Sequence, residues 1–144
     1  MIELGNKEHG DAIARAVPRN YNPAVDPVIS RSKDGKLLGG VIYEGYTGSC
    51  IFAHQAAFDK RWLSRDMLWM LFHYPFIQLK CKKLCGTIPS GNTALLAFNA
   101  KLGFKVEHVI EDGYPDGGMM ILSMKRDECR WLDIKQRTFE GASE

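Results

Sequence analysis

The sequence predicts a mixed α/β domain, with a central, mostly antiparallel sheet, one parallel strand-helix-strand unit and helices on both faces. Three observations support this fold class. The chain has 144 residues, the size of one domain with a substantial core. Its first part contains apolar runs separated by Gly-containing turns, whereas apolar residues recur at helical spacing in its middle. A helix then joins two strands, and such a crossover places parallel strands in one sheet.

The composition is that of a globular protein. Hydrophobic residues make up 45% and charged residues 25%, which excludes a disordered chain, a coiled coil and a collagen-like fibre. The net charge of +2 is too small to indicate a general nucleic-acid or membrane binder. No apolar run approaches the roughly 20 residues of a membrane helix, and no leader pattern opens the chain, so we expect a cytoplasmic protein. We expect one domain over residues 1–132 and a flexible tail over 133–144.

The first third predicts a short amphipathic helix and an antiparallel meander. The helix covers roughly Lys7 to Val17, and a loop rich in Pro, Asn and Asp follows it. A hairpin then begins at Val28, turns at Asp34-Gly35 and returns over Leu37 to Tyr43. A third strand covers Ser49 to Ala56.

A stripe of apolar residues at helical spacing predicts a long helix from about Ser64 to Leu79, which Pro75 should kink or end. A short buried strand follows over Lys83 to Ile88. Asn92 then begins a second helix, and Gly103 ends it as a left-handed C-terminal cap. Two further strands complete the order, over Lys105 to Glu111 and Met119 to Lys125.

The four cysteines predict reduced, mostly buried thiols. Cys50, Cys81, Cys85 and Cys129 form neither a CxxC pair nor a dense disulfide pattern. A zinc site from Cys81, Cys85, Cys129 and a histidine is disfavoured by the spacing, so no metal is expected.

The segment between the third strand and the long helix is a candidate anion site. It reads Asp59-Lys-Arg-Trp-Leu-Ser-Arg-Asp66. A helix start directs unpaired backbone N–H groups and the positive end of the helix dipole towards one point, which suits phosphate. The alternative is a helix start capped by Ser64, with the basic side chains only solvated.

The segment Asn92-Thr-Ala-Leu-Leu-Ala-Phe-Asn-Ala-Lys-Leu-Gly-Phe104 resembles a motif of the GNAT superfamily of acyl-CoA-dependent N-acyltransferases. In that family an Asn opens the last long helix and Lys-Leu-Gly-Phe closes it. The resemblance extends over roughly Asp26 to Met124, and the element order agrees with the family's fold.

The resemblance implies a site for acetyl-CoA as co-substrate. The strand Phe52 to Phe58 would part from the next parallel strand, and the pantetheine would lie in the opening. The pyrophosphate would bind at the helix start, where Ser64 and Asp66 stand at positions that are small in the family. The implied cofactor-binding residues are Ala56, Ala57, Phe58, Arg61, Trp62, Leu63, Ser64, Arg65, Asp66, Asn92, Phe98 and Lys101.

The catalytic groups are less specified by the sequence. Asn99 occupies the position at which the family usually has a tyrosine acid, and an amide can donate a hydrogen bond but not a proton. Tyr114, Tyr46 or water would then protonate the leaving thiolate. His54 is the candidate base, because its ordinary pKa lies near neutrality; the alternative is a structural histidine in the sheet. A backbone N–H near Ala56 or Ala57 would polarise the thioester carbonyl.

The sequence therefore predicts an N-acetyltransferase that moves an acetyl group from acetyl-CoA to a primary amine by direct attack, without an acyl-cysteine. The acceptor is a small molecule or a protein, and the resemblance is compatible with a homodimer. The alternative is a catalytically inactive binding or interaction module with the GNAT fold.

Overall fold

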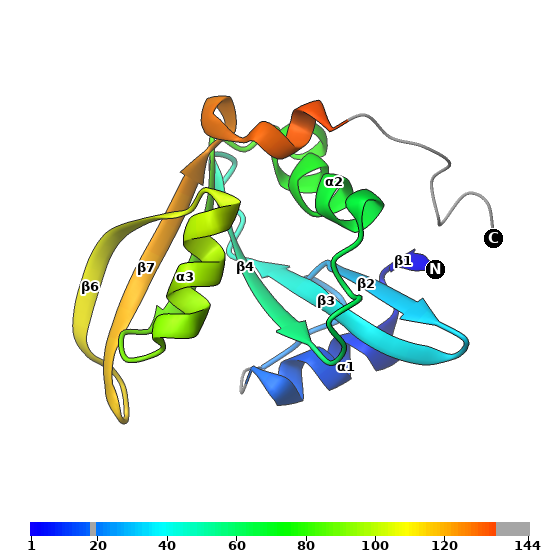
Figure 1. Cartoon of the computed structure of the whole chain (residues 1–144), viewed down its shortest axis with the longest axis horizontal. Helices are drawn as coiled ribbons and strands as arrows, with labels where there is room; N and C mark the ends of the chain where they lie inside the picture. The colour runs from blue at the N-terminus through cyan, green and yellow to red at the C-terminus, as the bar shows by residue number, and fades with distance from the viewer. Residues whose placement is uncertain (18–19, 135–144) are drawn as a thin grey trace.

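The computed structural model describes residues 1–17 and 20–134, and it contains one sheet of seven strands (Figure 1). The strand order is β1-β2-β3-β4-β5-β7-β6. The strands are β1 Ile2–Leu4, β2 Val28–Lys33, β3 Lys36–Glu44, β4 Cys50–Ala57, β5 Lys83–Pro89, β6 Lys105–Tyr114 and β7 Gly117–Lys125. Only β4 and β5 are parallel, so the predicted fold class is confirmed.

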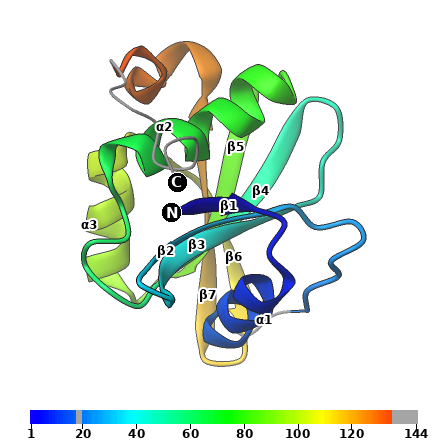
Figure 2. The ribbon, with the colours of Figure 1, turned by 90° about the vertical axis from the view of Figure 1, so that its right-hand side faces the viewer.

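Three α-helices pack on the sheet: α1 Lys7–Ala16, α2 Arg65–His73 and α3 Thr93–Leu102. Helix α1 packs on one face, where Ile13 and Ala14 contact side chains of β2, β3 and β4. Helix α2 covers the other face, where Met67 and Phe72 belong to the largest core cluster. Figures 1 and 2 show α1 and α2 on opposite sides of the layer formed by β2 and β3.

The β2–β3 hairpin turns as predicted. Asp34 and Gly35 have φ values of 53° and 77°, so both central residues adopt the left-handed conformation that a two-residue turn requires. Likewise, Gly103 ends α3 with a φ of 113°, and the Asn92 side chain accepts a hydrogen bond from the Leu95 N–H at 3.0 Å.

Pro75 ends the regular part of helix α2, as predicted. A wider π-helical turn, Tyr74–Gln78, follows His73. Proline has no N–H to donate to the carbonyl of Leu71, four residues before it. The buried Tyr43 hydroxyl donates to that carbonyl instead, at 2.7 Å, and thereby joins β3 to α2. Burial also raises the pKa of Tyr43 well above its usual value.

Both ends of the described chain are attached to the rest of the fold. The prediction that the first element is a helix was wrong, because β1 pairs with β2 in front of α1. The three residues of β1 are too few to show a periodic pattern in the sequence. Near the C-terminus, Trp131 Nε1 donates to the Leu102 carbonyl at 2.7 Å and Cys129 is buried, so this segment packs against the end of α3 and the core. The rest of the predicted tail, from residue 135, lies outside the described residues. No helix within the described part of the chain is long and apolar enough to cross a membrane.

Candidate active site

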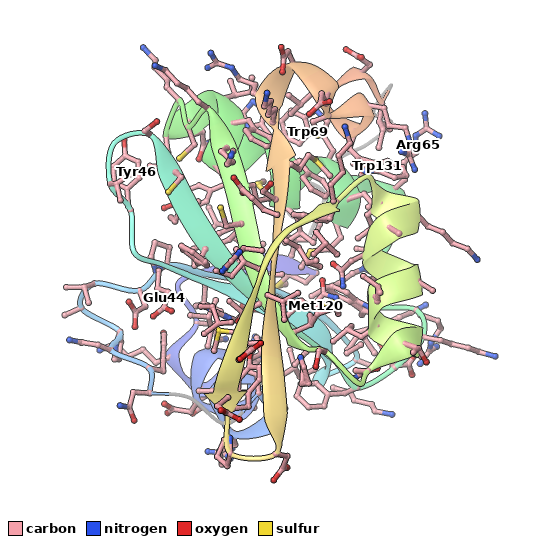
Figure 3. The ribbon with its side chains drawn as sticks, turned by 90° about the vertical axis from the view of Figure 1, so that its left-hand side faces the viewer. Glu44, Tyr46, Arg65, Trp69, Met120 and Trp131 are labelled. Carbon is pink, nitrogen blue, oxygen red and sulfur yellow. The ribbon has the colours of Figure 1, made fainter. Side chains whose placement is uncertain are left out.

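The two halves of the sheet part between β4 and β5. Their parallel pairing runs only from Cys50↔Lys83 to Phe52↔Cys85, whereas β4 continues to Ala57 and β5 to Pro89. In Figure 1 the lower ends of β4 and β7 accordingly point apart. The opening forms a cleft of about 1010 Å³, which is lined by residues of β4, β5, α3 and the β6–β7 turn. Figure 3 shows the molecule from the side of β6 and β7, with Glu44 to the left and α3 to the right.

A histidine–carboxylate pair lies on the β4 side of the cleft. His54 Nε2 is 2.9 Å from Glu44 Oε1, and both residues line the cleft. The pairings Ile42↔His54 and Glu44↔Phe52 place both side chains on one face of neighbouring strands. The His54 side chain is only 9% exposed. A carboxylate this close stabilises a proton on the imidazole, so the pair can accept one.

The backbone of β4 also faces the opening. The Phe58 N–H donates to Leu38, so in this antiparallel register the even-numbered residues of β4 direct their backbone groups towards β3. Ala53, Gln55 and Ala57 therefore direct theirs towards β5, beyond the last β4–β5 pair. These groups are suited to bind an extended polar chain as a strand would.

Two further polar side chains reach the cleft from its other side. Asn99 on α3 is buried and donates Nδ2 to the Leu95 carbonyl at 2.9 Å. The Tyr114 hydroxyl donates to Thr87 Oγ1 on β5 at 3.2 Å. Both Asn99 and Tyr114 line the cleft. The sequence predicted that β6 ends at Glu111, but the strand extends to Tyr114, because the turn is confined to Pro115 and Asp116.

Cys85 lines the cleft at the last pair between β4 and β5. Burial, with the nearby Cys50 thiol as a smaller cause, raises the pKa of Cys85 to about 11. A thiol with this pKa is protonated at neutral pH and is therefore a poor nucleophile.

The start of α2 is a second polar region. Ser64 Oγ accepts from the Met67 N–H at 3.2 Å and caps the helix, while Asp66 is buried. Arg61 is exposed and donates Nε and Nη2 to Asp59, each at 2.9 Å. These hydrogen bonds hold the pKa of Asp59 well below its usual value. Trp62 is buried in the core beside the loop.

Comparisons with known proteins find solved structures with a similar architecture. No protein family and no curated protein matches the sequence. Among solved structures, mutant forms of the spermidine/spermine N-acetyltransferase of Vibrio cholerae match with a TM-score of 0.72 at 10% identity, covering 94% of this chain and 99% of theirs. A GNAT family acetyltransferase of Elizabethkingia anophelis, with acetyl-CoA bound, matches with a TM-score of 0.68 at 13% identity over 86% and 97%. An IAA acetyltransferase of Bacillus cereus matches with a TM-score of 0.66 at 15% identity over 87% and 98%. The chain has the GNAT fold.

Within this fold, the predicted site residues fall into four groups. His54, Asn99 and Tyr114 line the cleft. Ala57, Phe58 and the segment 59–66 lie at the end of β4 and the start of α2, with Leu63 packed against the core. Ala56 is buried against α1, and the register turns its backbone towards β3 rather than the cleft. On α3, Asn92 caps the helix, Phe98 packs against the core and Lys101 is exposed at the C-terminal end.

Sequence reasoning missed Glu44, Thr87 and Gln55, which also line the GNAT cleft. No local sequence signal identified Glu44, because its contact with His54 depends on the register between β3 and β4. Within residues 1–17 and 20–134, no three His, Cys, Asp or Glu side chains gather in a group that could hold a metal ion.

Proposed function

We propose that the protein is an N-acetyltransferase that transfers the acetyl group of acetyl-CoA to a primary amine by direct attack. The observation that carries this proposal is the cleft between the parted strands, with the His54–Glu44 pair on its wall. This arrangement offers a backbone surface for an extended thioester and a proton acceptor for the amine.

In the reaction, the amine nitrogen forms a bond to the thioester carbonyl carbon and the carbon–sulfur bond breaks. His54 accepts the proton that the amine loses, and the nearby Glu44 carboxylate stabilises the resulting imidazolium. The thiolate leaves as coenzyme A and takes a proton from the Tyr114 hydroxyl or from water. The buried Asn99 amide can donate a hydrogen bond in the same cleft but cannot supply that proton.

Binding of acetyl-CoA would use two regions. The pantetheine would pair with the backbone of Ala53, Gln55 and Ala57, which faces the opening. The pyrophosphate would bind at the start of α2, where the helix dipole and the Arg61 guanidinium favour anions. Arg61 would then exchange at least part of its contact with Asp59 for phosphate oxygens. The bound acetyl-CoA named for the Elizabethkingia neighbour and the amine acceptors named for the Vibrio enzyme support this assignment.

The second candidate is a binding module with the same fold but no turnover. The resemblance favours it by placing Asn99 where the family usually has its acid. Two observations add to this: Asp66 places a carboxylate at the α2 start, and Arg61 is already hydrogen-bonded to Asp59. A carboxylate near the diphosphate opposes binding, and loss of the acid slows departure of the thiolate.

A calorimetric titration with acetyl-CoA tests the proposal, followed by an assay for free thiol with a panel of amines. We expect binding that weakens about tenfold in Arg61→Ala, because a charge-assisted contact to phosphate is lost. Lys7→Ala, which removes one positive charge from the exposed start of α1, should not weaken it. Dephospho-CoA measures the contribution of the 3′-phosphate. Binding without thiol release would support the inactive module. Absence of binding would contradict the acetyltransferase and would also point to a module that has kept only the fold.

A further inference from the structure

Charge is unevenly distributed around the cleft. The chain has 19 Lys and Arg residues and a net charge of +2. Yet among residues 1–17 and 20–134, the cleft is lined by two carboxylates, Glu44 and Asp116, and by the imidazole of His54, but by no lysine or arginine. Basic residues such as Lys60, Arg61 and Arg65 lie instead at the start of α2.

The two carboxylates stand on different sides of the opening. Glu44 is the last residue of β3 and belongs to the half of the sheet that contains β4. Asp116 lies in the turn between β6 and β7, in the half that contains β5. Apolar groups of Phe52 and Pro115 also line the cleft. A ligand that reaches both carboxylates therefore needs a positive charge at each end and an apolar spacer between them.

We propose that the acceptor is an aliphatic amine with a second cationic group. This inference rests on the proposed function: one nitrogen reacts beside the His54–Glu44 pair, and the other lies near Asp116. The same charges separate the two substrates, because the phosphates of coenzyme A are attracted to the basic residues at the α2 start and repelled by the carboxylates that line the cleft.

Three compounds with the same four-carbon chain test the proposal: putrescine with a second ammonium group, butylamine with none, and γ-aminobutyrate with a carboxylate. The kcat/KM for acetylation should decrease in that order. Asp116→Asn should lower the ratio of kcat/KM for putrescine to that for butylamine about two- to fivefold, the value of one exposed ion pair. Asp112→Asn is the matched control, because Asp112 is exposed on β6 and its φ of 55° suits asparagine.

Binding of the three compounds to the protein without cofactor gives a second, independent readout. Stronger binding of putrescine than of butylamine, reduced in Asp116→Asn, would support the cationic site even if acetylation failed, and that failure would then count against the proposed function alone. Equal use or binding of γ-aminobutyrate and putrescine, or the same preference in Asp116→Asn, would overturn the inference.

Discussion

Within residues 1–17 and 20–134, two histidines lie beside a carboxylate, and one of these two pairs lies at the cleft. His54 Nε2 is 2.9 Å from Glu44 in the opening between β4 and β5. His9 Nδ1 is 2.7 Å from the Ser30 hydroxyl and 3.4 Å from Glu3, where α1 meets β1 and β2. A carboxylate beside a histidine is therefore not enough to identify a candidate base.

The difference lies in what surrounds each ring. Ser30 is completely buried in β2, so the His9 ring satisfies a hydroxyl that water cannot reach. Asn6 adds to this network, since it caps α1 and donates to Glu3 at 2.9 Å. The His9 side chain is 18% exposed and that of His54 only 9%, so exposure alone would have selected the wrong histidine. The parting of the two strands makes His54 a candidate base.

Replacing each histidine gives the largest predicted contrast. His54→Ala should lower kcat/KM for acetyl transfer about a hundredfold or more, because a general base is lost. The KM for acetyl-CoA should change little. His9→Ala should leave both parameters unchanged and lower thermal stability. Steady-state kinetics with thermal unfolding of both variants makes the comparison, and equal activity losses would remove the distinction between the two pairs.

The two carboxylates provide the next contrast. Glu44→Gln keeps a hydrogen-bond acceptor near His54 but removes the charge that stabilises the imidazolium. We expect kcat to fall about tenfold, because a charged acceptor contributes roughly 1 to 1.5 kcal/mol more than a neutral one. Glu3→Gln serves as the matched control and should leave kcat unchanged. A fully active Glu44→Gln enzyme would show that this carboxylate has no role in proton transfer.

The buried hydroxyl of Ser30 tests the structural pair. Ser30→Ala removes the partner of His9 Nδ1 and should destabilise the fold by about 1 kcal/mol. For a domain of this size, the midpoint of thermal unfolding would fall by roughly 3 to 5 °C. Calorimetry measures the shift. A loss of acetyl transfer without loss of stability would mean that this region takes part in function.

Replacing Cys85 should have the smallest effect on acetyl transfer, and it tests whether a thiol takes part in the reaction. With its pKa raised to about 11 by burial, the thiol should react slowly with iodoacetamide at pH 7 and faster as the pH approaches that value. Cys85→Ser should retain acetyl transfer within about twofold, since direct attack needs no thiol nucleophile. An acetylated Cys85 detected by mass spectrometry, or an inactive serine variant, would instead indicate an acyl-enzyme.

Local signals predicted most of the fold. The Asp34-Gly35 turn, the Asn92 and Gly103 caps and the position of Pro75 each depend on residues close in sequence, and the structure has all four features. The strand β1 gave no such signal, because it is stabilised by pairing with a segment far along the chain. The predicted strand ended at Glu111, yet the pairing of β6 with β7 extends to Tyr114.

The site was predictable only in part for the same reason. The sequence identified His54 and Asn99 as candidates, and both line the cleft. The contact between Glu44 and His54 depends on the β3–β4 register, which the sequence did not reveal. The hydrogen bond between Arg61 and Asp59 depends on side-chain conformations, which the sequence did not reveal either. Asp116 lies far along the chain from both strands that carry the His54–Glu44 pair, so only the folded sheet brings it to the same cleft.

The most direct test of the central claim is the release of free thiol from acetyl-CoA in the presence of an amine, measured for the wild type, His54→Ala and His9→Ala. Our account predicts amine-dependent release by the wild type and by His9→Ala, and little release by His54→Ala. Absence of release from all three while acetyl-CoA binds, or full release by His54→Ala, would contradict it.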